Sequence, residues 1–287
     1  MTWTAPILIR TPRFTIEGVS RAGNETWFRV RELGISLDIG RCPDTLVGMH
    51  NVFITHAHLD HALGVPFYGA QRRLYRLGVG NVFIPAETAD DFRALIALHE
   101  KMSQTEFPIE LIPLAPGERW RLRRDLFVRA HRATHRVPAN AWEFLESRHK
   151  LRADFADRKG EELARLRSEG VDVEARVERS ILFYTGDTDR RILEQSQAIF
   201  DAEVLMIECS FTGDGEEDRA AAYTHIHLSD LWEFADRFRN ETIVLTHFSL
   251  RDTPAEIHAR VKAEAPRVLR ERIVLALPEP YSRIVDR

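Results

Sequence analysis

The chain has few cysteines and no long hydrophobic run. Its 287 residues include two cysteines, Cys42 and Cys209, which lie far apart in the sequence. A disulfide framework is therefore excluded, and a reducing compartment is expected. No apolar run approaches the roughly 18 residues that span a bilayer, and the N-terminal segment lacks the pattern of a secretory signal. These absences predict a cytoplasmic protein.

An excess of charge of one sign is also absent. The chain has 40 Lys and Arg residues against 44 Asp and Glu residues, a net charge of −4. A general electrostatic attraction to nucleic acid is not expected, although a local basic patch remains open. Hydrophobic residues make up 44% and charged residues 29% of the chain, as in an ordinary globular protein. This composition excludes a disordered, coiled-coil or collagen-like chain.

Short apolar runs predict a strand-rich fold with intervening helices. Strands are expected at 14–19, 27–30, 35–39, 51–55, 81–85, 181–184, 204–207 and 243–245, and helices at 64–77, 90–102 and 228–239. Several of these strands lead directly into polar residues that can bind metal. Ligand sites in α/β sheets lie outside the carboxyl ends of strands, so this placement indicates a site there.

One charge-dense segment interrupts the strand-rich pattern. Between Arg148 and Gly170 there are seven Lys and Arg residues against five Asp and Glu residues. Apolar residues recur through it at helical spacing. We predict a charged helical arm or insertion at about 143–179. A solvated surface helix is the alternative interpretation.

A histidine cluster follows the expected strand at 51–55. It reads His56-Ala57-His58-Leu59-Asp60-His61. Neutral imidazole and carboxylate are good zinc ligands. Alternate residues of an extended segment project to one side, so His56 and His58 can reach one ion. Asp60 and His61, beyond a turn, can reach a second ion.

Two ions need ligands from elsewhere in the chain. The candidates are His135, Asp187 and His247, each of which follows an apolar run. None is specific by itself, because an Asp after Gly is usually a turn or helix-cap residue. Their order along the chain, together with the histidine cluster, is more informative.

The sequence resembles the metallo-β-lactamase superfamily, and within it the ribonuclease Z (tRNase Z) branch, most closely the short plant form. The superfamily has H-x-H-x-D-H, then a lone His, an Asp and a final His, in the order found here. The motifs that resemble the branch are Leu37–Pro43 (LDIGRCP), Gly170–Val173 (GVDV), Thr185–Thr188 (TGDT), His225–Ser229 (HIHLS) and Leu245–Arg251 (LTHFSLR).

The resemblance implies a single domain over residues 1–287. Its fold would be α/β, with αββα layers in which two mixed sheets pack face to face under outer helices. It also implies two Zn²⁺ ions per chain, with Mn²⁺ and Fe²⁺ as alternatives. The first ion would take His56, His58 and His135, the second Asp60, His61 and His247, and Asp187 would bridge them. Asp38 would orient a ligand histidine.

The activity implied by the resemblance is endonucleolytic removal of the 3′ trailer of precursor tRNA, with a metal-bridging hydroxide as nucleophile. His227 would protonate the leaving oxygen, with Glu208 holding its tautomer, and Asp60 could shuttle a proton. From its position two residues before His227, His225 is expected to be a structural histidine, with a substrate contact as the alternative. The residues expected to contact RNA are Arg148, Lys150, Arg152 and Arg251. Members of the branch are commonly homodimers.

Two other functions remain open from the sequence. The same metal residues would serve a hydrolase of a small phosphodiester, aryl sulfate or lactone. The acidic net charge and Ala141-Trp142, which departs from the branch, favour this alternative, whereas the His227 motif and the charged segment favour RNA. Asp252 is a further departure from the branch. A scaffold that merely retains the fold is disfavoured, because every ligand position of the motif is filled.

Overall fold

The computed structural model describes residues 5–285, which form two seven-stranded sheets. The first sheet has the order β1 (Ile7–Arg10), β2 (Thr15–Arg21), β3 (Glu25–Val30), β4 (Ile35–Leu37), β5 (Asn51–Phe53), β6 (Gly80–Pro85) and β7 (Ile109–Leu114). The second has the order β14 (Ile273–Leu275), β13 (Thr242–Thr246), β12 (Val204–Glu208), β11 (Glu174–Tyr184), β10 (Ala139–Leu151), β9 (Leu126–Ala133) and β8 (Arg119–Arg123).

Each sheet joins an antiparallel half to a parallel half. Strands β1 to β4 pair antiparallel and β4 to β7 parallel, while β8 to β11 pair antiparallel and β11 to β14 parallel. The carboxyl ends of the parallel strands within a sheet therefore lie at the same edge. The mixed sheets implied by the family resemblance are confirmed.

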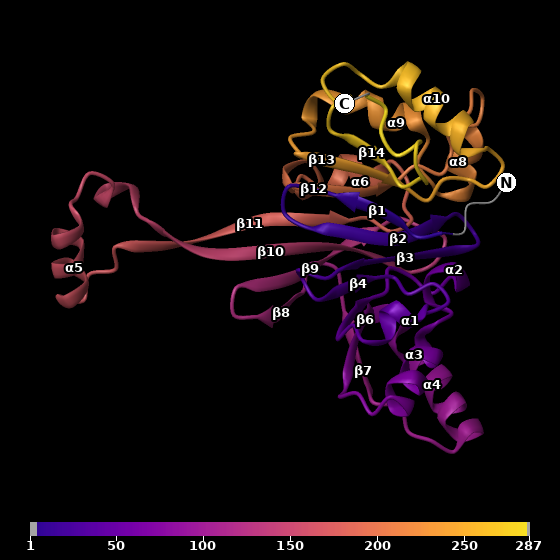
Figure 1. Ribbon diagram of the computed structural model, residues 1–287, viewed down its shortest axis with the longest axis horizontal. Coiled ribbons are helices and arrows are strands. Elements are labelled where there is room, and N and C mark those ends of the chain that lie inside the picture. The colour runs from indigo at the N-terminus through magenta and orange to yellow at the C-terminus, as the bar shows by residue number, and fades with distance from the viewer. Residues whose placement is uncertain (1–4, 286–287) are drawn as a thin grey trace.

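Helices cover the outer face of each sheet (Figure 1). Those associated with the first sheet are α1 (Asp44–Val47), α2 (Leu59–Ala62), α3 (Val65–Leu74) and α4 (Ala89–Ser103), with a 3-10 turn at Ala86–Thr88. Those associated with the second are α6 (Arg191–Gln195), α7 (Ala198–Asp201), α8 (Glu217–Tyr223), α9 (Leu228–Glu233) and α10 (Pro254–Glu264), with a 3-10 turn at Ala235–Arg237. The layers follow the predicted αββα order.

Successive side chains of a strand point to opposite faces of its sheet, and the buried side chains therefore form three separate hydrophobic clusters. In the segment that contains β5, Phe53 points between the sheets, whereas Val52 and Ile54 pack under the helices of the first sheet. Phe53 stacks on Phe83 at 4.4 Å between ring centroids and meets Trp142 edge-on at 5.4 Å. Truncating such a fully buried aromatic ring to Ala costs about 3–5 kcal/mol. This central cluster holds the two sheets, and hence the loops at their edges, in fixed relation.

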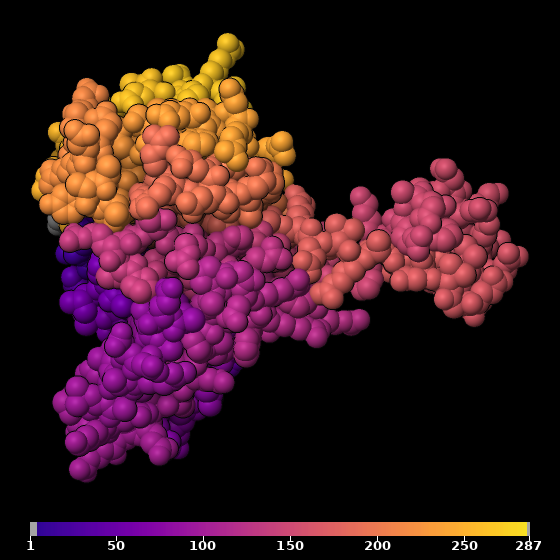
Figure 2. All heavy atoms as spheres, turned by 180° about the vertical axis from the view of Figure 1, so that it is seen from behind, coloured from indigo at the N-terminus to yellow at the C-terminus, as the bar shows by residue number. Residues whose placement is uncertain are grey.

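The segment predicted as a helical arm is mostly a two-stranded ribbon. Strands β10 and β11 continue beyond the body and carry α5 (Gly160–Ser168) and a 3-10 turn at Ala153–Phe155 (Figures 1 and 2). The helical prediction is correct for α5 and wrong for 143–151 and 174–179. Those residues pair across the ribbon from Glu143–Phe183 to Leu151–Glu174, a long-range pairing that local spacing does not encode. We call residues 147–178 the arm.

Within residues 5–285, every helix is too short or too polar to cross a bilayer. Cys42 and Cys209 are both free thiols and both buried. The cytoplasmic location remains a prediction.

Candidate metal centre

Loops at the edge of the two sheets bring the seven predicted ligands together. The segment after β5 supplies His56 and His58, α2 supplies Asp60 and His61, and the loops after β9, β11 and β13 supply His135, Asp187 and His247. Their ligand atoms form two groups, within each of which all atoms lie within 4.8 Å of one another. One group is His56, His58, His135 and Asp187; the other is Asp60, His61 and His247.

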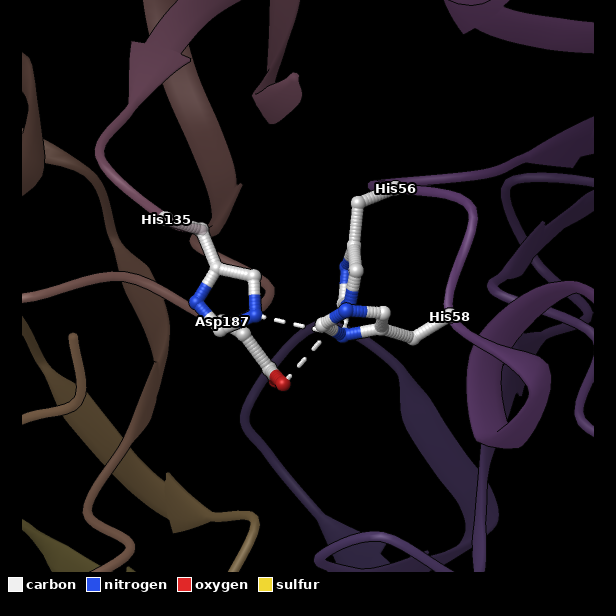
Figure 3. A group of neighbouring side chains, drawn as sticks. All are labelled: His56, His58, His135 and Asp187. Carbon is white, nitrogen blue, oxygen red and sulfur yellow. Dashed lines mark hydrogen bonds and ion pairs between the residues drawn. The ribbon is translucent and has the colours of Figure 1, made fainter. Parts of the chain in front are cut away.

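The first group converges on a small space between its side chains (Figure 3). Nδ1 of His58 lies 3.0 Å from Nε2 of His56 and 3.3 Å from Nε2 of His135. Zinc–nitrogen bonds of about 2.0–2.1 Å in a tetrahedron separate ligand atoms by roughly 3.3 Å. The observed spacing is therefore that of a tetrahedral ligand set.

Asp187 connects the two groups. Its Oδ2 lies 3.7 Å from Nε2 of His56 and 3.3 Å from Nε2 of His247, and its Oδ1 lies 3.4 Å from Nε2 of His61. Oδ1 is buried without a hydrogen-bond partner among the described residues. A buried carboxylate oxygen without a partner is costly unless a cation faces it. The residues present thus fit a divalent metal that Asp187 would share.

The ligand histidines are oriented by contacts on their outward ring nitrogens. Nδ1 of His61 donates to Asp38 at 2.8 Å, and the same carboxyl accepts from the Thr55 backbone and from the Tyr184 hydroxyl at 2.7 Å each. The corresponding nitrogen of His135 lies 3.2 Å from the Thr224 carbonyl. These contacts leave the inward nitrogens free to bind metal. Asp38 therefore contacts a candidate ligand histidine, as the family resemblance implied.

Two backbone features keep these contacts in place. Asp38 and His247 both have positive φ, at 53° and 59°, a conformation that costs a non-glycine residue about 1–3 kcal/mol and recurs at functional sites. Gly186, with φ of 58°, approaches Thr55 so closely that an added Cβ would lie 2.5 Å from the Thr55 Cβ. A side chain at position 186 would displace the residue that holds Asp38.

The charge of the cluster follows from its burial and its carboxylates. Burial opposes ionisation of Asp187, but His247 and His61 hold its pKa well below the usual range. Burial likewise opposes the charged form of His61, but Asp187 and Asp38 raise its pKa well above the usual value. His56 differs, because burial and then His61 lower its pKa. Anionic carboxylates beside imidazoles form a site suited to a cation.

The structure contradicts the predicted pairing of Glu208 with His227. Nδ1 of His225 lies 2.7 Å from Oε1 of Glu208. The ring of His227 instead caps helix α9, where Nδ1 accepts from the Ser229 backbone at 3.2 Å and Nε2 donates to the Gly213 carbonyl at 3.0 Å. Both ring nitrogens of His227 are occupied, and the residue is buried.

His225, expected to be structural, lies at the metal residues. One of its ring nitrogens is within 4.8 Å of ligand atoms of Asp187 and His247. Its Nε2 has no hydrogen-bond partner within residues 5–285. Burial opposes its charge, but Glu208 raises the pKa of His225 to about 9. The sequence offered two histidines, His225 and His227, as candidates for the partner of Glu208. Only the structure shows which of the two rings faces Glu208.

None of the four residues predicted to contact RNA belongs to the two groups of candidate metal ligands. Arg148 and Arg152 pair with Glu146 and Asp154 at 2.6 and 2.7 Å, and Lys150 has no ion-pair partner in the described chain. All three lie on or beside the outer part of β10. Arg251 is exposed four residues after His247, and its guanidinium forms no ion pair within residues 5–285.

Comparison with known proteins agrees with the fold and identifies the family. Residues 37–248 match the family described as the Beta-lactamase superfamily domain. The tRNase Z TRZ1 of Arabidopsis thaliana is 33% identical over 256 residues, covering 88% of this chain and 91% of that protein. The chloroplastic tRNase Z TRZ2 of the same plant is 36% identical over 251 residues, covering 86% and 71%.

The chain is thus a β-lactamase-superfamily protein. Within that superfamily it belongs to the tRNase Z family. The crystal structure of human tRNase Z, short form, shares the fold at a TM-score of 0.56 and 18% identity, covering 98% of this chain and 94% of that one. The metallo-β-lactamase fold protein YhfI of Bacillus subtilis does so at a TM-score of 0.57 and 13% identity, covering 85% and 89%.

Proposed function

We propose that this protein is a metal-dependent endoribonuclease that removes the 3′ trailer from precursor tRNA. The observation that carries the proposal is His225, held by Glu208 with its Nε2 unpartnered, beside two groups of metal ligands. A phosphodiesterase needs both a site for cations and a proton donor for the leaving oxygen. The tRNase Z relatives support the choice of RNA as substrate.

The proposed ions are two zinc ions, with Mn²⁺ and Fe²⁺ as alternatives. His56, His58 and His135 would hold one and Asp60, His61 and His247 the other, with Asp187 shared. When bound, the ions would lower the pKa of a water molecule and offset charge on the phosphate.

The remaining chemistry is assigned to side chains of this chain. His225, rather than His227, would donate a proton from Nε2 to the leaving ribose 3′-oxygen, and Glu208 would hold its Nδ1 proton. Asp60 could accept the proton of the attacking water. Burial opposes the charged form of Asp60, but the neighbouring His247 and His61 lower its pKa, so its carboxylate is ionised at neutral pH.

The arm is the proposed contact with the body of the RNA. It carries Arg148, Lys150 and Arg152 and extends well beyond the sheets (Figure 1). Contacts of this kind bind phosphates without reading sequence. Arg251, exposed and without an ion pair in the described chain, would reach a phosphate nearer the site.

We also propose that the protein is a homodimer. Helices α2 to α4 expose apolar side chains around a groove of about 750 Å³, among them Leu59, Leu63, Phe67 and Met102. Contiguous exposed apolar surface of this kind commonly marks an interaction site. Light scattering during size-exclusion chromatography would give the mass of the particle in solution.

Cleavage of a 3′-extended precursor tRNA beside bis-(p-nitrophenyl) phosphate tests the function, with the bound metal counted in the same preparation. A single cut at the trailer junction is expected. Hydrolysis of the small diester with intact tRNA would favour the small-substrate alternative. Trp142 does not support that alternative, because it is fully buried between the sheets.

A further inference from the structure

The hydroxyl of Ser210 lies between the carboxylate of Glu208 and the ring of His247. Its Oγ is 2.7 Å from Oε2 of Glu208 and 2.9 Å from Nδ1 of His247. All three residues are buried, with exposed fractions of 4% or less. No role for Ser210 follows from the motif residues identified in the sequence.

The direction of each hydrogen bond in this chain is determined by the chemistry of Glu208. Its two carboxylate oxygens act as acceptors, because they accept from the backbone N–H groups of Thr188, Ser210 and Ile226 at 2.8, 3.2 and 3.3 Å. The single proton of the Ser210 hydroxyl is therefore donated to Oε2. Oγ of Ser210 is left as an acceptor, and Nδ1 of His247 donates to it.

This arrangement specifies the tautomer of two histidines. With its proton on Nδ1, His247 presents the lone pair of Nε2 to the space near Asp60 and Asp187, whose oxygens lie 3.5 and 3.3 Å away. The other oxygen of Glu208, Oε1, accepts from Nδ1 of His225. Both imidazoles thereby turn their Nε2 atoms away from Glu208.

We propose that Ser210 is a positioning residue that links the Glu208 carboxylate to His247 through two hydrogen bonds. The buried Glu208 side chain would then orient both His247, a metal ligand, and His225, the proton donor. The hydrogen-bond relay depends only on the contacts above, whereas the roles of the two histidines rest on the proposed function. A carboxylate that orients a metal-bound histidine directly is common. Here a hydroxyl is inserted, and this leaves Glu208 an oxygen for His225.

Main-chain hydrogen bonds hold the loops after β12 and β13 together, so the Ser210 hydroxyl can be removed without displacing them. Ser210 follows the last residue of β12 by two positions, and the Cys209 N–H donates to the Thr246 carbonyl at 2.9 Å. The Ser249 N–H donates to the Ser210 carbonyl at 3.1 Å. Main-chain bonds on both sides of His247 thus join the two loops independently of the Ser210 hydroxyl.

The test uses the full-length protein with Ser210→Ala, Ser210→Thr and Ser249→Ala. Ser249 is a matched control, because it lies two residues after His247 and, within residues 5–285, its hydroxyl bonds only to the Arg251 N–H, at 3.3 Å. Chelated protein is titrated with Co²⁺, followed by its visible absorption, and the imidazole tautomers are read by ¹⁵N NMR. Ser210→Ala should weaken binding of one equivalent by about 10–100-fold and lose the Nδ1–H tautomer of His247. Ser210→Thr should restore both, and Ser249→Ala should match the wild type.

Two outcomes would overturn the proposal. If Ser210→Ala titrates like Ser249→Ala, the hydroxyl does not position His247. If Ser210→Ala is impaired and Ser210→Thr does not rescue it, the effect is one of packing. A double variant with Glu208→Gln should lose less affinity than the sum of the single losses, because both act in one chain; additive losses would contradict the relay. Failure to cleave precursor tRNA, with the expected Co²⁺ and NMR results, would reject the proposed function alone.

Discussion

Oε1 of Glu208 lies 2.7 Å from Nδ1 of His225, and the neighbouring His227 is directed away from it into the cap of helix α9. Two histidines of one motif therefore have different tasks. Nε2 of His225 has no hydrogen-bond partner within residues 5–285, whereas the ring of His227 caps the helix that follows it. The contrast gives a direct test of the proposed proton donor.

Replacing His225 by Ala should reduce the turnover of precursor tRNA by about 10²–10⁴-fold, the usual contribution of a general acid. His227→Ala should instead lower the free energy of unfolding by about 0.5–2 kcal/mol through the lost helix cap, with turnover of the folded protein close to wild type. Single-turnover cleavage and urea unfolding of both variants check this. A large loss of turnover in His227→Ala, with stability unchanged, would contradict the assignment.

Stability should depend on pH through the Glu208–His225 pair. The pKa of His225 is raised to about 9, above the unfolded value of about 6.5. The pair therefore stabilises the fold fully below pH 6.5, and this contribution is lost as the pH rises through 9. Urea unfolding of the chelated protein from pH 6 to 9.5 should show a decrease of the order of 3 kcal/mol that is absent from Glu208→Gln. Equal pH slopes in the two proteins would disprove it.

Asp38→Asn should weaken the metal group that contains His61. The amide cannot match a carboxylate that accepts from His61, Thr55 and Tyr184 together. Loss of such an orienting partner typically costs about 10–100-fold in metal affinity, and here it should affect one of two equivalents. Metal titration by calorimetry measures this.

Tyr184→Phe is the control for that experiment. It removes one hydrogen bond, worth about 1 kcal/mol of stability, and leaves the Asp38 charge in place. Its metal affinity should be reduced less than that of Asp38→Asn. An Asp38→Asn protein with two unchanged equivalents would show that Asp38 does not support the site.

Removal of the arm should separate binding from chemistry. Glu146 and Arg179 face each other across the ribbon, so residues 147–178 can be replaced by an Asn-Gly hairpin turn. Helix α5 has no buried residue, and turnover of bis-(p-nitrophenyl) phosphate should stay within about twofold of wild type, whereas affinity for precursor tRNA should fall by about tenfold or more.

A charge-reversed variant of Arg148, Lys150 and Arg152 refines that test in the intact arm. Each lost phosphate contact should reduce the slope of log affinity against log salt by about one. Unchanged affinity and salt slope would show that these three residues do not contact the RNA.

Local sequence was sufficient for the features that depend on neighbouring residues. His56, His58, Asp60 and His61 fall within six positions after a buried strand, so their convergence could be predicted from alternation and a turn. The strand runs that flank the cluster were predicted for the same reason, since a strand such as β5 shows its two faces in its own residues. His135, Asp187 and His247 could be added to the ligand set only because their order along the chain resembles that of the metallo-β-lactamase superfamily.

Tertiary structure alone decided the features that depend on distant partners. Residues 143–151 belong to a segment predicted to be helical, yet they form a strand, because β11 pairs with them along the ribbon. Glu208 pairs with His225 rather than His227, because His227 is the N-cap residue of α9 and its ring is hydrogen-bonded to Ser229 and Gly213. The sequence determines which chemical groups are available to the site. Which ring nitrogen faces which carboxylate depends on how the loops of the two sheets meet at one edge.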